Sequence, residues 1–245
     1  MKFNTKIITE YLNSNKYDFS LFNIDYTNNE TKTIKDFSIT KSITYEHYGT
    51  IDTIKNMNQF LSNIGNNTKA CVNNIEKIII RLIKKVLVSY NMENFWLAIR
   101  VTLPSDNYNI PRWHKDGSLF ISDENETNIA KFVTTLKGPG TLLIKSTTQI
   151  NNIYNKLLEK KFKEMDKYKT IEKKIKIDDS FRPIFAKKFS KEKIIQVKNN
   201  QGVLFYTGNP ENNAALHSEP KFDKSRIFIS ILPGSYNDIK ELQKR

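Results

Sequence analysis

Apolar residues recur at helical spacing between Thr68 and Tyr90, and this is the clearest regular pattern in the chain. They lie three and four residues apart and form one broad face, made of Val72, Ile75, Ile78, Ile79, Leu82, Ile83, Val86 and Leu87. Basic residues lie mostly on the other face. The pattern predicts a long amphipathic helix whose apolar side belongs to the core and packs against a sheet.

The first 65 residues are more polar and carry shorter patterns. Lys6 to Leu12 predicts a short helix, and the alternation from Ile39 to Tyr48 predicts a strand. Ile51 to Ile64 shows the three-and-four spacing of a second amphipathic helix.

From about Asn94 the pattern changes from helical to extended, and short apolar runs alternate with turn signals such as Gly138-Pro139-Gly140. Seven short strands are predicted, at Phe95–Leu103, Ala130–Leu136, Thr141–Lys145, Ile194–Val197, Gly202–Tyr206, Ala214–His217 and Arg226–Leu232. Many short strands closed by turns favour a double-sheet jelly roll, the architecture of cupins. The expected class is therefore α+β or mainly β: a double-stranded β-helix barrel buttressed by N-terminal helices.

Residues 146–193 interrupt the strand pattern with helical spacing. Residues 146–197 carry 14 Lys/Arg against 7 Asp/Glu, a surplus of 7 out of the chain's net charge of +13. Two interpretations stay open for this basic helical insertion. It forms either a lid or partner surface, or a helical segment packed on the barrel with its lysines in water.

The domain organisation follows from these patterns. We expect a mixed, helical flank at 1–92, a barrel core at 93–235 that contains the insertion at 146–193, and a tail at 236–245. A chain of 245 residues suits one large domain of this kind.

The net charge of +13 favours an acidic partner or a nucleic-acid surface. The alternative is that lysine is simply abundant on solvated faces. No arginine-rich block distinguishes the two.

The single cysteine, Cys71, excludes an internal disulfide and suits a reducing compartment. Residues 1–8 lack the apolar run of a signal peptide, and no stretch approaches the ~20 apolar residues of a membrane span. We therefore expect an intracellular, cytoplasmic protein without a membrane span.

The candidate chemistry is concentrated in the stretch from Arg112 to Gly117, which contains His114 and Asp116. Side chains at i and i+2 of an extended segment point to the same side, so these two can converge on one ion. His217 would complete a set of two histidines and one carboxylate, which leaves coordination positions open and suits non-haem Fe(II). Nine residues later, Arg226 opens a predicted strand and could pair with a carboxylate beside the metal.

His114, Asp116, His217 and Arg226 together resemble the pattern of the Fe(II)/2-oxoglutarate-dependent dioxygenases, over roughly residues 93–235. The spacing of the distal histidine and the arginine is closer to the prolyl-hydroxylase-like branch than to the nucleic-acid demethylases. The resemblance implies Fe(II) as cofactor and 2-oxoglutarate and O2 as co-substrates. It also implies that the three first-named residues are the metal ligands.

The same resemblance implies how 2-oxoglutarate binds. Its far carboxylate would pair with Arg226 and share a hydroxyl on a neighbouring strand. Thr135 is the candidate for this hydroxyl and Thr134 its competitor, because only one of two adjacent strand residues can face inward.

The chain departs from the family in one respect. The family's arginine often lies in an Arg-x-Ser pattern, but here Phe228 stands two residues after Arg226. Ser225 or Ser230 would have to serve, or no serine does.

Four further residues carry weaker expectations. His47 has no partner at ligand spacing and is expected to be structural or exposed, and Cys71 is expected to be core. Trp113 and Tyr206 flank the site in sequence, where either could wall a pocket or pack in the core.

The activity implied by the resemblance couples decarboxylation of 2-oxoglutarate to succinate with hydroxylation of a C–H bond. A protein or peptide side chain is the first choice of substrate, from the spacing of His217 and Arg226. A nucleic acid is second, from the charge, and a small molecule or lipid is also compatible with such barrels. Two non-enzymatic alternatives remain: a cupin-like metal-binding barrel without activity, and a basic nucleic-acid-binding module.

Overall fold

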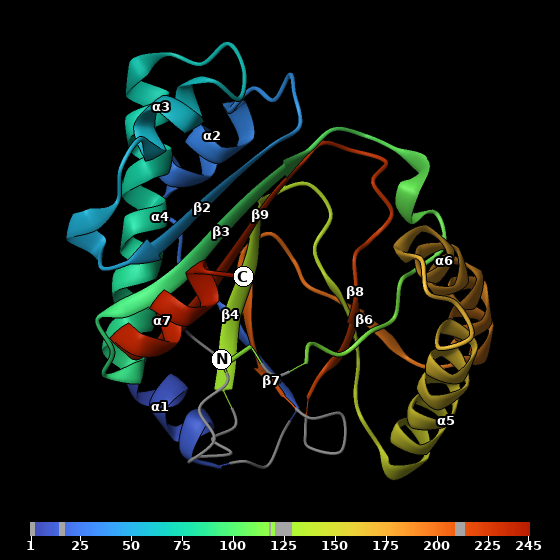
Figure 1. Ribbon diagram of the computed structural model, residues 1–245. Helices are drawn as coiled ribbons and strands as arrows, with labels where there is room; N and C mark the ends of the chain where they lie inside the picture. The colour runs from blue at the N-terminus through green and yellow to red at the C-terminus, as the bar shows by residue number, and fades with distance from the viewer. Residues whose placement is uncertain (1–2, 15–17, 118, 121–128, 209–213) are drawn as a thin grey trace.

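The computed structural model describes residues 3–14, 18–117, 119–120, 129–208 and 214–245. Within these ranges the chain folds into two antiparallel sheets with helices on the outside (Figure 1).

The larger sheet has six strands in the spatial order β1-β7-β4-β9-β3-β2, and every neighbouring pair is antiparallel. The strands are β1 (Phe19–Asn23), β2 (Ile43–Gly49), β3 (Asn94–Thr102), β4 (Ile129–Lys137), β7 (Gln201–Thr207) and β9 (Arg226–Gly234).

The smaller sheet has three strands in the order β6-β5-β8, again antiparallel, with β5 (Leu142–Ile144), β6 (Ile194–Gln196) and β8 (Leu216–Ser218). An isolated bridge extends it beyond β8, because the backbones of His114 and His217 exchange two hydrogen bonds of 2.9 Å. The bridge brings two histidines that are far apart in sequence onto adjacent extended segments.

Four helices cover one face of the large sheet (Figure 1): α1 (Thr5–Ser14), α2 (Asn28–Asp36), α3 (Met57–Ser62) and α4 (Lys69–Tyr90). The hydroxyl of Thr68 accepts a hydrogen bond from the backbone N–H of Cys71 and so starts α4. Asn91 ends it in the left-handed region, at φ +51°. In the described part of the chain, no helix combines the length and apolar character needed to cross a membrane.

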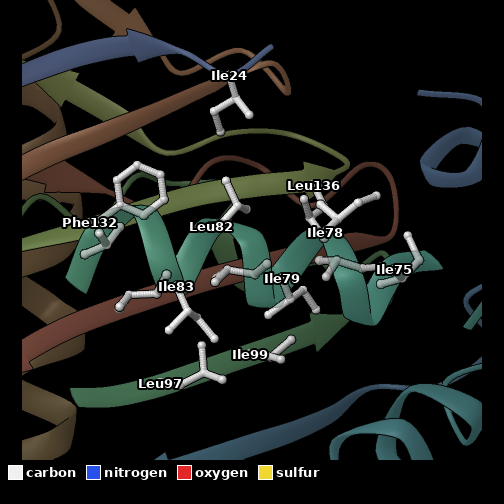
Figure 2. Packing of buried hydrophobic residues seen from close by; sticks show 14 of the residues in the cluster. Ile24, Ile75, Ile78, Ile79, Leu82, Ile83, Leu97, Ile99, Phe132 and Leu136 are labelled. Atoms are coloured by element: carbon white, nitrogen blue, oxygen red, sulfur yellow. The ribbon is translucent and has the colours of Figure 1, made fainter. Parts of the chain in front are cut away.

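The apolar face of α4 packs on the large sheet (Figure 2). Ile79, Leu82 and Ile83 are fully buried there, in the same core cluster as Leu97 of β3 and Phe132 of β4. The long helix predicted from the apolar spacing is confirmed, as is its role as a buttress.

The central strands of the large sheet are largely buried on both faces, and strand alternation divides their side chains between two cores. In β7, Leu204 and Tyr206 belong to the core beneath α4, whereas Val203 and Phe205 pack with Leu143 of the small sheet. The strands therefore present one apolar face to the helices and a second face to the small sheet.

The insertion forms two helices, α5 (Thr148–Met165) and α6 (Ile171–Lys188), which pack on each other. Tyr154 and Phe185 bury against Trp113, Ile144 and Leu216 on the outer side of the small sheet. The helices pack on the small sheet with their lysines mostly at the surface, and the choice between a lid or partner surface and a solvated helical segment stays open.

Two predictions about the N-terminal part need correction. The helix expected at 51–64 is broken into a 3-10 turn, Ile51–Thr53, and α3, because Asn56 adopts the left-handed conformation at φ +60° between them. The strand expected at 39–48 begins only at Ile43 and continues to Gly49 as β2.

Three elements were not predicted. β1 and α2 lie in the polar N-terminal region, where a capping box between Thr27 and Glu30 starts α2. The expected tail is a helix, α7 (Tyr236–Gln243), which Ser235 and Asp238 cap and which buries Ile239 against Leu232. The domain boundaries expected at residues 92/93 and 235/236 stay a prediction. Strands β1 and β2, which belong to the expected flank at 1–92, form the two edges of the large sheet.

Replacement of Ile79 by alanine tests the α4 buttress. Ile79 is fully buried, so Ile79→Ala should lower the free energy of unfolding by about 2–5 kcal/mol through lost packing and a cavity. Val88 on the same helix is 69% exposed, and Val88→Ala should change it by no more than about 0.5 kcal/mol. Urea denaturation measures both, and equal effects would contradict the packing.

Candidate metal centre and cleft

A cavity of about 650 Å³ is lined by residues of both sheets. The large sheet contributes residues from β3, β4 and β9, and the small sheet contributes β8 and the segment around His114. The three predicted metal ligands and Arg226 all line this one cavity.

His114, Asp116 and His217 converge within it. Their nearest ligand atoms all lie within 4.8 Å of one another. Oδ1 of Asp116 is 3.8 Å from Nε2 of His114 and 3.7 Å from Nε2 of His217. The β-bridge brings the two histidines together, and the extended segment after His114 carries the carboxylate to the same side.

Backbone carbonyls determine which nitrogen of each ring is free. Nδ1 of His114 is 2.7 Å from the carbonyl oxygen of Arg112, and Nδ1 of His217 is 3.0 Å from that of Ala215. A carbonyl can only accept, so each Nδ1 carries the proton and donates. Each Nε2 therefore offers a lone pair toward the carboxylate, as a metal ligand must.

Burial keeps both rings uncharged. It lowers the pKa of His217 to about 3, with the nearby His114 acting in the same direction. It also lowers the pKa of His114. Two neutral imidazoles at neutral pH are suitable metal ligands.

The carboxylate is held in the ionised form. Burial acts to raise the pKa of Asp116, but the ammonium of Lys131 and the two histidines together outweigh burial and hold that pKa well below its usual range. Lys131 forms an ion pair with Oδ2, while Oδ1 faces the two histidines. One carboxylate oxygen is thus available as a ligand.

Arg226 is a buried cation without an acidic partner in the described ranges. Arg226 is 5% exposed, and its Nη2 donates to Oγ1 of Thr141 at 3.2 Å and of Thr135 at 3.5 Å. Nε is buried with no hydrogen-bond partner among those residues, and burial lowers the pKa of Arg226 to about 10. A buried guanidinium with a free donor is suited to binding an anion.

The structure separates the two candidate threonines. Thr135 faces Arg226, whereas Oγ1 of Thr134 donates to the backbone carbonyl of Gln201 at 2.8 Å. Of the two candidate serines, Ser230 lines the cavity and Ser225 lines a different hollow.

Three contributions to this site were not predicted from the sequence. Lys131 and Thr141 were missed, although Lys131 lies four residues before Thr135 on one strand and so shares its face. Arg112, which pairs with Glu219 at 2.6 Å, was also missed, although it lies two residues before His114.

The remaining residues lie away from the cavity lining. Trp113 is packed against α6, and Tyr206 lies in the core beneath α4, so both are core aromatics. His47 is buried, with Nε2 3.0 Å from the carbonyl oxygen of Thr50. Cys71 is a partly buried free thiol packed at the edge of the main core.

Several solved structures are similar to this chain in fold. A prolyl-4-hydroxylase from Pseudomonas putida has a TM-score of 0.43 at 9% identity, covering 94% of this chain and 98% of that chain. HygX from Streptomyces hygroscopicus, with nickel and 2-oxoglutarate bound, has a TM-score of 0.43 at 7% identity, covering 93% and 86%. A prolyl hydroxylase from Trichoplax adhaerens, in complex with a hypoxia inducible factor peptide fragment, has a TM-score of 0.39 at 8% identity, covering 97% and 91%.

These proteins are of the dioxygenase family that the four-residue pattern resembles. No protein-family model and no curated protein matches the sequence. Because each of these three TM-scores is below 0.5, the similarities support no functional conclusion. The function is argued from the side chains of the site instead.

Replacement of a candidate ligand histidine should weaken metal binding selectively. We expect His217→Ala to weaken Co(II) binding by at least about 100-fold, because the nitrogen that completes the cluster is lost. His47→Ala removes the histidine that lies outside the cluster and should leave Co(II) affinity unchanged. Isothermal titration calorimetry measures both, with circular dichroism to verify folding. Equal affinities in the two variants would contradict the site.

Proposed function

We propose that the protein is an Fe(II)- and 2-oxoglutarate-dependent dioxygenase that hydroxylates a C–H bond. One observation carries the proposal: two neutral imidazole nitrogens, one carboxylate oxygen and buried Arg226, which has no acidic partner among the described residues, line the same cavity. The first three suit a metal, and the fourth suits the anionic end of a co-substrate.

The donor set fits Fe(II). Two histidine nitrogens and one carboxylate oxygen on one side of an ion leave its other positions open, which is the arrangement of non-haem Fe(II) oxygenases. Hydrogen bonds from each Nδ1 to a backbone carbonyl orient the rings, as outer partners of metal-bound histidines commonly do. Fe(II) bound there, with 2-oxoglutarate and O2, supplies the chemistry that oxidises a C–H bond and releases succinate and CO2.

The remaining residues position the co-substrate. Arg226 would pair with the far carboxylate of 2-oxoglutarate, and the hydroxyls of Thr135 and Thr141 would complete that subsite. Lys131 neutralises the second oxygen of Asp116 and keeps the first oriented toward the histidines. Phe228 and Phe222 lie against the guanidinium and limit its contact with water.

The substrate and the barrel type belong to the same proposal. The spacing of nine positions from His217 to Arg226 favours a protein or peptide side chain as the group that is hydroxylated. The two facing antiparallel sheets support the double-stranded β-helix predicted from the strand pattern.

Anaerobic addition of Fe(II) and then 2-oxoglutarate tests the cofactors without knowledge of the substrate. A chelate of the two should give a weak visible charge-transfer band. His114→Ala should abolish the band. Arg226→Ala should raise the 2-oxoglutarate concentration that it requires by about 100-fold or more, because the far carboxylate loses its buried partner.

The absence of any band in folded wild-type protein would refute the proposal. A band of equal strength in His114→Ala would contradict the assigned ligands. Lys6→Ala, at an exposed position of α1, is the control for nonspecific effects.

The two threonines provide a matched pair of variants. Thr135→Val removes a hydroxyl that faces Arg226 and should weaken 2-oxoglutarate binding by about 3- to 10-fold. Thr134→Val removes a hydroxyl bonded to the backbone of Gln201 and should leave that affinity unchanged. Titration of the charge-transfer band gives both values, and the reverse order would place the wrong threonine in the subsite.

A further inference from the structure

Strand β3 presents a row of hydrogen-bond donors to the cavity. Trp96, Ala98, Arg100 and Thr102 occupy alternate positions of the strand, and all four line the cavity that holds the metal cluster. An indole N–H and a guanidinium can only donate, and a hydroxyl can donate. We call Trp96, Arg100 and Thr102 the β3 donor row.

Arg100 in this row has no partner among the residues that the structure describes. Across the described ranges its guanidinium makes neither a hydrogen bond nor an ion pair, and it is exposed to the cavity. The other charged groups of the lining are satisfied differently, since Lys131 pairs with Asp116 and Arg112 pairs with Glu219. Under the proposed function Arg226 binds 2-oxoglutarate, so Arg100 is the cation of the lining that remains available for another anion.

Arg100 and Arg226 lie close enough for their two positive charges to act on the same part of the cavity. They lie on neighbouring strands, where Arg226 is in register with Thr102 and Arg100 with Phe228. The positive charge of Arg100 contributes to the lowered pKa of Arg226, after burial. Two like charges at one cavity are unfavourable unless anions bind there, and together they attract more than one anion.

The other two donors of the row point to the same chemistry. Nε1 of Trp96 and Oγ1 of Thr102 are buried and have no hydrogen-bond partner within the described residues. Buried donors of this kind are costly unless a ligand accepts from them. On the cavity face of the strand only Ala98 lies between Trp96 and Arg100, and Ala98 is in register with Ser230. These two small side chains leave space for a ligand group.

We propose that the β3 donor row binds an oxyanion, a carboxylate or a phosphate, that is carried by the prime substrate. This inference rests on the proposed function, because it assigns Arg226 to the co-substrate and Arg100 to the molecule that is hydroxylated. The oxidised C–H bond would lie in the same cavity as this anionic group, and Arg100 determines which substrates are accepted.

The indole N–H signals of 15N-labelled protein test the row directly. The chain has two tryptophans, and Trp113→Phe identifies the signal of Trp96 by elimination. Sodium phosphate and sodium acetate are titrated separately, first without metal and then with diamagnetic Zn(II) and 2-oxoglutarate present. We expect one of the two ions to shift the Trp96 signal in a saturable way under both conditions, and the tighter ion identifies the class of anion.

Arginine variants then locate the anion. Arg100→Gln should weaken the response by at least about 10-fold, because the charged donor is lost. Arg226→Gln should retain the anion-induced shift of the Trp96 signal in the metal-free titration. Arg245→Gln is the matched control, since Arg245 is exposed at the C-terminus and does not line the cavity. Arg100→Lys, which keeps the charge, should keep part of the response.

Three results would overturn the inference: no shift with either ion, a shift unchanged in Arg100→Gln, or a shift lost only in Arg226→Gln. The metal-free titration does not depend on iron or turnover. Its failure is therefore distinguishable from failure of the charge-transfer band, which tests the proposed function alone.

Discussion

The ion pair between Lys131 and Asp116 is the interaction on which the site depends. A carboxylate removed from water is costly unless a cation and hydrogen bonds compensate it, and here an ammonium from the opposite sheet does so. The pair leaves one oxygen of Asp116 directed at two imidazoles, His114 and His217, which burial keeps neutral. Burial thus keeps the two imidazoles uncharged, whereas the charged groups around Asp116 keep its carboxylate ionised despite burial.

Sheet pairing explains why these groups meet. The bridge between His114 and His217 continues the small sheet, and Lys131 reaches across from the large sheet, so the cluster joins the two layers. Alternation along β9 directs Arg226 to the cavity and Ile227 to the core beneath α4. Helix α4 packs on the face of the sheet that is opposite the cavity (Figure 1). Side chains on hydrogen-bonded strands are held more precisely than side chains on loops.

The sequence predicted the position of a residue where that position depends on residues nearby in the chain. It did not predict the position where that depends on how strands pair with one another. The helical spacing of residues 68–90 and the spacing of His114 and Asp116 could be recognised directly, and the structure contains that helix and brings the two side chains together. The choice between Thr134 and Thr135 needed the position of the strand relative to its neighbours, because adjacent residues point to opposite faces. The partner of Lys131 depends on the packing of two sheets, which no local pattern encodes. The break at Asn56 was hidden because one left-handed residue interrupts an otherwise regular apolar spacing.

The decisive measurement is the formation of succinate from 2-oxoglutarate under O2 by the Fe(II)-loaded protein. The wild type and the Asp116→Asn variant are measured side by side. The substitution keeps the size of the side chain and removes the charge that pairs with Lys131 and that the proposed metal would require. The proposed function predicts succinate in proportion to the 2-oxoglutarate consumed by the wild type and none above background in Asp116→Asn. Folded, iron-loaded wild type that forms no succinate, or a variant that forms as much, would contradict the assignment of this cavity as a dioxygenase centre.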